Sequence, residues 1–345
     1  NIVMPVVTLV SSIAYNSSLN TIALFGQSGS EVAANHIVLI DLADNAPGNV
    51  VINEIDLSGL VGLSSNDNYL TAGILQDDGS VIALGTGELA STQGSVTFLL
   101  RVKADGSIDS TFDDLASDDA NDDILSVDIS AIGQVTSGKL VQLSDSSVIY
   151  SAIDYEQSYL IKLTDADPSD GVDAQKYAVD TSFGNSLGAT GIITVDMSGL
   201  ATYSSPPQIE IRDLKVNSND EIIAVGNAAF DYEPTGFIAK LNGLNGAPHD
   251  TFGANSLPGY LVPNGRIQCS YLDSMMNGPP PGTTESKLCD IVGYDNISLT
   301  NDGSIIINAI LEDSLENSVN SVILKFIEQF DDTASPYSIY VGSPP

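Results

Sequence analysis

The sequence predicts an all-β fold, a β-propeller of about five four-stranded blades in a single domain with long loop insertions. Short apolar, β-rich runs separated by turn signals recur along all 345 residues. Four such runs repeat with a period of roughly 60 to 80 residues, which is typical of propeller blades. A lone four-stranded sheet leaves two apolar faces exposed, and stacking blades around an axis buries both. Six blades remain an alternative, and little helix is expected because no 3.6-residue periodicity persists.

The first repeated element is a short apolar strand that follows a tight turn. Three copies follow the tripeptides Asp78-Gly79-Ser80, Asp145-Ser146-Ser147 and Asp302-Gly303-Ser304. Asp-Gly supplies the positive φ that a two-residue hairpin turn requires. The five copies of the strand are 21–26, 81–85, 148–152, 221–226 and 305–309.

The second repeated element is a strand with a basic residue at its fourth position. It places four cations at one register of the repeat, namely Arg101, Lys162, Lys240 and Lys325. One interpretation is a ring of cations that binds an anion in the axial channel. The other is one structural ion pair per blade, for example with Asp109 or Asp180. The apolar strands favour the ion pair, because partly buried charges need partners.

The third repeated element ends in a phenylalanine. It has the form Asp-x-Ser/Thr-Phe at 109–112 and 180–183, and His249-Asp-Thr-Phe in the next copy. This spacing places Phe112, Phe183 and Phe252 at equivalent positions. The expected blades are 10–60, 66–130, 138–200, 208–265 and 290–342. Residues 2–10 are expected to be a strand rather than a signal peptide, because the run is short, contains Pro5 and lacks a positive flank.

The run 98–113 carries a family resemblance. It reads Phe-Leu-Leu-Arg-Val-Lys-Ala-Asp-Gly-Ser-Ile-Asp-Ser-Thr-Phe-Asp, and it resembles the delta-60 repeat family of bacterial propeller-like repeats. The resemblance covers the second to fourth copies well, the fifth partly and the first only by strand pattern. Asp113 replaces the family's closing glycine. The resemblance implies a propeller-like fold in an exported or surface-attached protein, and it implies no single activity.

The two cysteines flank a Gly- and Pro-rich segment. Cys269 and Cys289 are expected to form a disulfide that closes a loop insertion at 266–290. Closing about 20 residues would contribute roughly 3 kcal/mol in the chain-entropy model. The alternative is two buried free thiols in a cytosolic protein.

The insertion after the second cation strand, which carries Lys162, is rich in acids. Asp165, Asp167, Asp170 and Asp173 surround Gly171, and calcium takes six to eight oxygen ligands, often around a glycine turn. One interpretation is therefore a calcium site, although the spacing of the acids departs by one residue from that of calcium-binding hairpins. The other is a solvated acidic loop. Apart from calcium, the sequence predicts no cofactor.

Composition excludes several classes of function. With 45 acidic and 11 basic residues the net charge is −34, which disfavours nucleic acid and anionic lipid as partners. No run of about 18 apolar residues could span a bilayer. The two histidines, His36 and His249, give a triad few candidates, and both are expected to be structural. The sequence has no dinucleotide fingerprint or phosphate-binding glycine loop.

These observations favour a non-enzymatic, secreted or cell-surface binding or adhesion module. The partner would be a protein or a surface component, contacted through the loops 113–123, 164–180 and 266–290. Loops on a rigid scaffold commonly carry recognition. One alternative is an extracellular polysaccharide hydrolase or lyase that uses paired carboxylates. Another is a structural spacer or filament subunit.

Overall fold

The computed structural model divides into two compact units by internal contacts. Unit 1 comprises 1–154, 160–183 and 187–192, and unit 2 comprises 155–159, 184–186 and 193–345. Each unit is described by itself. The structure describes residues 9–28, 34–42, 51–57, 68–88, 95–109, 112, 124–127, 136–154, 157–165, 177–184, 191–197, 207–230, 233–250, 252–254, 257–261, 266–268, 288–300, 303–313, 318–328 and 337–342.

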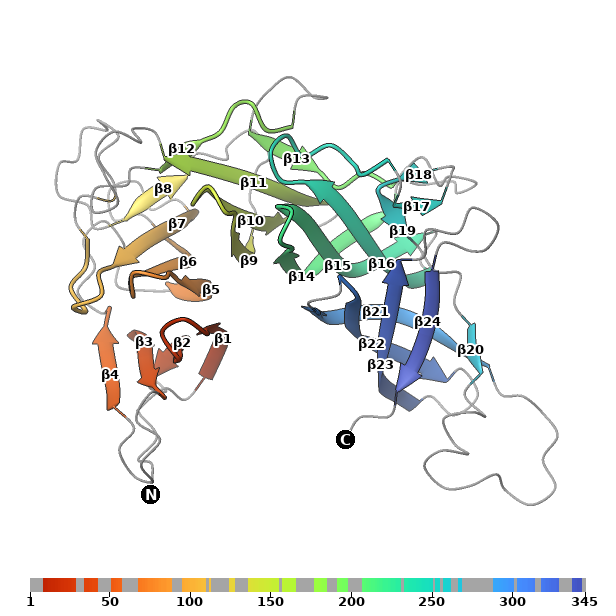
Figure 1. Ribbon diagram of the computed structural model, residues 1–345, viewed down its shortest axis with the longest axis horizontal. Coiled ribbons are helices and arrows are strands. Elements are labelled where there is room, and N and C mark those ends of the chain that lie inside the picture. The colour runs from red at the N-terminus through yellow and green to blue at the C-terminus, as the bar shows by residue number, and fades with distance from the viewer. Residues whose placement is uncertain are drawn as a thin grey trace, which may run out of the picture. The chain divides into compact units, whose positions relative to one another are not determined.

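The described chain is all-β, and five antiparallel sheets form its blades (Figure 1). The predicted fold class, a β-propeller of five blades, is confirmed. In the first three blades each strand pairs with a strand next to it in the sequence. Blade 1 consists of β1 (Leu9–Asn16), β2 (Thr21–Ser28), β3 (Ala34–Asp41) and β4 (Val51–Asp56); blade 2 of β5 (Tyr69–Leu75), β6 (Val81–Glu88), β7 (Ser95–Val102) and β8 (Leu125–Val127); blade 3 of β9 (Thr136–Gln142), β10 (Val148–Ile153), β11 (Ser158–Asp165) and β12 (Tyr177–Val179), with β13 (Ile192–Thr194) also paired to β11.

The last two blades follow the same plan with small additions. Blade 4 consists of β14 (Gln208–Val216), β15 (Glu221–Phe230), β16 (Glu233–Asn242) and β19 (Tyr260–Leu261), with a separate ribbon of β17 (Gly253–Ala254) and β18 (Leu257–Pro258). Blade 5 consists of β20 (Arg266–Gln268), β21 (Leu288–Leu299), β22 (Ile305–Asp313), β23 (Ser318–Glu328) and β24 (Tyr337–Gly342).

Within unit 1, blades 1 and 2 share an apolar core. Strand β5 packs over β1 and β2, and Phe25 of blade 1 is fully buried against blade 2. The ring of Phe25 lies directly over Gly73, where any side chain would overlap it. A polar contact joins the same two blades, because the side chain of Asn35 bonds to the Asn68 carbonyl and to the Leu70 amide.

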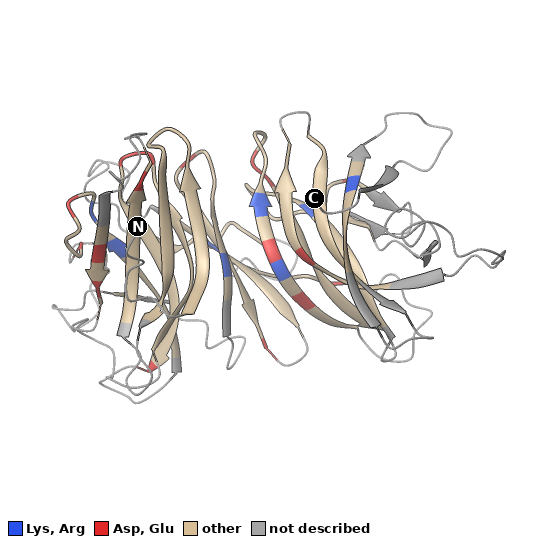
Figure 2. Cartoon of the chain, turned by 90° about the horizontal axis from the view of Figure 1, so that it is seen from below, with Lys and Arg blue, Asp and Glu red and all other residues tan. Residues whose placement is uncertain are grey.

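Within unit 2, blades 4 and 5 pack through β21. This strand contacts β14, β15 and β16. Tyr294 lies over Gly236 and meets Phe326 edge-to-face at 6.2 Å between ring centroids. Asp213 of blade 4 accepts a hydrogen bond from the Ile297 amide of blade 5. In Figure 2 most of the described strand residues are neither acidic nor basic, which agrees with the many buried apolar residues on these strands.

Four hairpins, β5–β6, β9–β10, β14–β15 and β21–β22, turn in the same way. In each, one residue takes a positive φ, and it is Gly79, Ser146, Asp220 or Gly303. The amides of Gln76, Leu143, Asn217 and Thr300 each donate to the carbonyl of the residue four positions later. These shared contacts align blades 2 to 5 residue by residue, although Asp-Gly itself occurs in only two of the turns.

The segment 266–290 departs from the sequence prediction at both ends. We expected a loop insertion, but residues 266–268 form β20 and pair with 288–290 of β21. Blade 5 therefore begins before the cysteine-flanked segment. Cys289 lies on β21, whereas Cys269 lies outside the described residues, so the disulfide stays a prediction.

The predicted N-terminal strand is described only at its end. The structure assigns Leu9 and Val10 to the start of β1, while residues 1–8 lie outside the described part of the chain. The described residues include no helix of the length and hydropathy that crossing a bilayer requires.

Candidate binding pocket in blades 4 and 5

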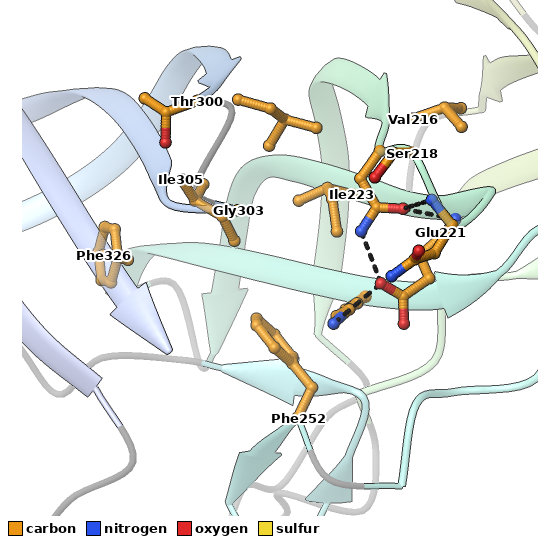
Figure 3. A pocket seen from close by; sticks show the side chains of 13 residues that line it. Val216, Ser218, Glu221, Ile223, Phe252, Thr300, Gly303, Ile305 and Phe326 are labelled. Atoms are coloured by element: carbon orange, nitrogen blue, oxygen red, sulfur yellow. Dashed lines mark hydrogen bonds and ion pairs between the residues drawn. The ribbon is translucent and has the colours of Figure 1, made fainter. Parts of the chain in front are cut away.

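A pocket of about 410 Å³ lies in unit 2 between two equivalent hairpin turns. One wall comes from the β14–β15 turn of blade 4 and the other from the β21–β22 turn of blade 5, as Figure 3 shows. Its volume falls within the range of about 300 to 1,000 Å³ that is typical of small-molecule sites. The lining residues are Val216, Asn217, Ser218, Asn219, Glu221, Ile223, Lys240, Phe252, Leu299, Thr300, Gly303, Ile305 and Phe326.

Glu221 is the most constrained side chain of the pocket. Its Oε2 accepts a hydrogen bond of 2.6 Å from the Asn217 amide and lies 3.1 Å from Lys240 Nζ. Its Oε1 lies 2.7 Å from His249 Nε2. The Asn217 side-chain oxygen in turn accepts from the backbone amides of Asn219 and Glu221. The carboxylate is therefore held by three groups on three segments of blade 4.

The pKa of Glu221 is below its ordinary value. Burial by itself raises the pKa of this carboxyl, but the hydrogen bonds from Asn217 and Lys240 and the charges of Lys240 and His249 outweigh it and lower the pKa. Glu221 is thus ionised at neutral pH. Lys240 lies in the same network with 7% of its surface exposed, and its Nζ also sits 5.9 Å from the centre of the Phe252 ring.

The cations of blades 2 and 3 form the ion pairs that one of our two interpretations expected. Arg101 lies 3.6 Å from Asp109 and 3.2 Å from Asp78, and Lys162 lies 3.2 Å from Asp180. Both cations are almost fully buried. Lys325 is half-buried at the same register of β23.

Blade 4 reaches the same charge balance with different residues. The amides of Asp109, Asp180 and His249 each donate to the carbonyl of their blade's cation, so His249 occupies the place of the two acids. Glu221 occupies the turn position at which blades 2, 3 and 5 have Ser80, Ser147 and Ser304. In blade 4 the acid that pairs with the cation therefore comes from the preceding turn, in the pocket wall, and none stands at the position of Asp109 and Asp180.

The three repeat phenylalanines keep a common place. The amides of Phe112, Phe183 and Phe252 donate to the carbonyls of Asp109, Asp180 and His249, respectively. All three rings are at most 2% exposed. In blade 4 this ring forms part of the pocket floor, below Glu221 in Figure 3.

The space corresponding to the pocket is bridged in unit 1. Asn16 of blade 1 and Asn217 of blade 4 occupy equivalent positions. Each directly follows a residue that pairs across its hairpin, because Tyr15 pairs with Ile22 and Val216 pairs with Ile222. The Asn16 amide crosses to blade 2 and donates to the Leu75 carbonyl and to Asp77. The Asn217 amide instead turns back to Glu221.

Several predicted site residues fall where the structure does not describe them. Asp165 ends β11, whereas Asp167, Asp170 and Asp173 lie outside the described residues, as do the loop 113–123 and most of 266–290. In the part of the chain that is described, no group of three or more potential metal ligands occurs. The calcium site stays a prediction.

Sequence reasoning missed the role of Glu221. Its signal was present, because aligning the turns shows a glutamate where three other copies carry serine, together with a histidine in place of aspartate at position 249. Only the structure shows that these two departures meet around one lysine.

Comparisons with known proteins indicate general likeness in fold only. No family model matches the sequence, and no curated protein matches it. Among solved structures, the chain is similar to a periplasmic gluconolactonase of Pseudomonas aeruginosa, with a TM-score of 0.45 and 10% identity over 97% of this chain and 73% of that one. It is also similar to a luciferin-regenerating enzyme, with a TM-score of 0.39 and 8% identity over 98% and 92%. Likeness this distant carries no functional conclusion.

Proposed function

We propose that this chain is a secreted or cell-surface binding module that holds its ligand on a rigid propeller scaffold. The observation that carries the proposal is the pocket between the β14–β15 and β21–β22 turns. Its ligand is either a small molecule or an exposed group of a larger protein or surface component. The net charge of −34 favours solubility of the module.

Two features of the pocket support binding. Its walls belong to paired strands and tight turns, so a ligand would meet a pre-formed surface with little ordering cost. The departures of blade 4 from the repeat, Glu221 and His249, lie in or beside the pocket wall. Blade 4 thus differs from the other copies of the repeat at the residues around the cavity, as we expect of a specialised recognition site.

The site can be tested by blocking the pocket. Ser218 is an exposed lining residue, and Ser218→Trp should fill the mouth and abolish ligand-induced increases in melting temperature. Ser144→Trp is the matched control, because Ser144 is an exposed residue at the same turn position of blade 3. A ligand panel of amino acids, peptides, sugars and organic acids should contain at least one compound that stabilises the wild type and the control but not the blocked variant. Absence of any such compound would contradict the proposal.

The polysaccharide-cleaving enzyme and the structural spacer stay alternatives from the sequence. The resemblance to the delta-60 repeat family also stays a prediction, and it agrees with an exported protein.

A further inference from the structure

We propose that the pocket of blades 4 and 5 binds a neutral carbohydrate unit of one or two sugar rings. This inference rests on the proposed binding function and assigns the chemical class of its ligand. Three properties of the described residues lead to it: the charge balance of the wall, the combination of a polar rim with apolar walls, and the group that fills the equivalent space in unit 1.

The charge of the pocket wall is already balanced. Glu221 receives Lys240, Asn217 and His249 at distances of 3.1 Å or less. A charged ligand would bring its own charge into a partly buried site where the nearest opposite charge is already paired, which costs desolvation energy. A neutral ligand avoids this cost.

The rim and the walls have different chemistry. Ser218 and Asn219 give the rim a hydroxyl and an amide group that both donate and accept hydrogen bonds, while the Thr300 hydroxyl donates to the Ser304 carbonyl and offers the rim an acceptor oxygen. Val216, Leu299 and Ile305 line the space with aliphatic surface. A sugar ring presents hydroxyl groups at its edge and C–H groups on its faces, so it matches both kinds of surface at once.

Unit 1 shows what fills this space when the chain supplies its own group. There the neutral amide of Asn16 donates to the Leu75 carbonyl. Leu299 is the counterpart of Leu75, since Leu75 pairs with Val81 and Leu299 with Ile305 across equivalent turns. Because Glu221 holds the Asn217 amide, a ligand hydroxyl takes the place of that donor at the Leu299 carbonyl.

The test measures binding by calorimetry across four panels: neutral mono- and oligosaccharides, uronic acids, amino sugars and short uncharged peptides. We expect a neutral sugar to bind, and its uronic acid and amino counterparts to bind at least about tenfold more weakly, the equivalent of one lost hydrogen bond. Ser218→Trp should abolish binding, and Ser144→Trp should leave it unchanged.

A second variant tests the mechanism. Glu221→Ser combined with His249→Asp gives blade 4 the residues of blade 3 at both positions and releases the Asn217 amide to cross to Leu299. The melting temperature should stay near that of the wild type while sugar affinity falls about tenfold. Thr300→Val, which removes one rim hydroxyl, should weaken binding in the same direction if the double variant does not fold.

The outcomes separate the two proposals. Binding of peptides alone, blocked by Ser218→Trp, would overturn the carbohydrate assignment and sustain the binding module. Preference for uronic acids or amino sugars would also overturn the assignment. Sugar binding that Ser218→Trp leaves intact would overturn the pocket as its site. No binding in any panel would overturn both proposals.

Discussion

At the scale of single residues, the chain solves one problem in two ways. A basic residue in an apolar strand must be paired. Blades 2 and 3 pair it with the acid that follows the strand, Asp109 or Asp180, and blade 2 adds Asp78 from the preceding turn. Blade 4 pairs Lys240 with Glu221 from the preceding turn and places His249 where the acid would stand. Because each change offsets the other, the two positions should be energetically coupled.

A double-mutant cycle should reveal this coupling. Glu221→Ser alone leaves a buried lysine without its carboxylate, and we expect a loss of about 3 kcal/mol in the free energy of unfolding. His249→Asp alone places a second acid beside Glu221 and should cost about 1 kcal/mol. The double variant should return to within about 1 kcal/mol of the wild type, as measured by urea denaturation. Additive losses would contradict the exchange.

Lowering the pH should reduce the stability that ion-paired carboxylates contribute to the folded state. Burial alone raises the pKa of Asp180, but hydrogen bonds from Ser182 and Lys162 and the charge of Lys162 lower it below its ordinary value. A lowered pKa in the folded state contributes stability above the ordinary aspartate pKa and loses it as the pH falls through the folded-state pKa. Asp180→Asn should therefore lower the melting temperature at pH 7 and flatten its decline below about pH 4. Parallel declines in variant and wild type would contradict this pairing.

The effect of calcium on the melting temperature should distinguish a calcium site from a solvated acidic loop after β11. A site formed by Asp165, Asp167, Asp170 and Asp173 predicts a melting temperature several degrees higher in calcium than in chelator, because binding to the folded state alone stabilises it. Asp170→Asn should remove that difference. A solvated acidic loop predicts equal melting temperatures in both conditions.

The sequence alone was sufficient to predict ion pairs at the repeated positions of blades 2 and 3. It was not sufficient to predict that blade 4 pairs its lysine with a different acid. The register of Arg101 and Lys162 and the acids Asp109 and Asp180 could be aligned by eye, and the pairing followed from the cost of a buried charge. The pairing of Lys240 with Glu221 joins residues that are 19 positions apart, and no local pattern indicates which turn reaches which strand.

At the scale of the element, blades contact each other through glycines that admit an aromatic ring. Phe25 covers Gly73 between blades 1 and 2, and Tyr294 covers Gly236 between blades 4 and 5. Each glycine lies inside a strand, where its lack of a side chain weakens the strand itself. The loss is offset by burial of a whole ring from the neighbouring blade.

Replacing one of these glycines with a larger residue should lower the free energy of unfolding. Gly73→Ala would drive a methyl group into the Phe25 ring, and overpacking of this kind costs about 1 to 3 kcal/mol. Urea denaturation should show the loss, and adding Phe25→Leu to the same chain should recover part of it by making room. A Gly73→Ala variant as stable as the wild type would show that the blades separate at little cost.

Strand positions were more predictable than strand ends. Apolar runs that follow Asp-Gly or Asp-Ser turns located β6, β10 and β22 within a few residues. The pairing of β20 with β21 was missed because β20 has three residues, Arg266–Gln268, and is separated from its partner by a Gly- and Pro-rich segment. Pairing across such a gap depends on the rest of the blade.

At the scale of the whole molecule, the charge is strongly one-sided. A net charge of −34 on 345 residues means that folding brings many carboxylates together, and their mutual repulsion opposes the compact state. Only 11 cations are available to offset them, and Arg101, Lys162 and Lys240 already form ion pairs within their own blades.

Salt should therefore stabilise the protein. Raising sodium chloride from about 10 mM to about 300 mM shortens the screening length from about 30 Å to below 10 Å, and we expect the melting temperature to rise and then level off. Scanning calorimetry at constant pH provides the measurement. A melting temperature that falls with salt would indicate that attractive pairs, rather than repulsion, dominate.

The repeat predicted the blade plan because it is a property of the entire chain. Five copies of the same strand-and-turn pattern imply five similar sheets, whatever the details of any one copy. The pocket could not be predicted in this way, since it arises where one copy departs from the others. Repetition specifies the scaffold, and its exceptions specify the site.

The strand order has a consequence for how the protein is made. In blades 1, 2 and 5 every strand bonds to its neighbours in the sequence, as in the order β5-β6-β7-β8, and the exceptions are the extra β13 in blade 3 and the short β17–β18 ribbon between β16 and β19 in blade 4. A blade leaving a ribosome or a secretion channel can complete its hairpins without waiting for residues still to come. Synthesis from one end can thus lay down finished modules in turn, and the unfinished remainder at any moment is little more than one module long.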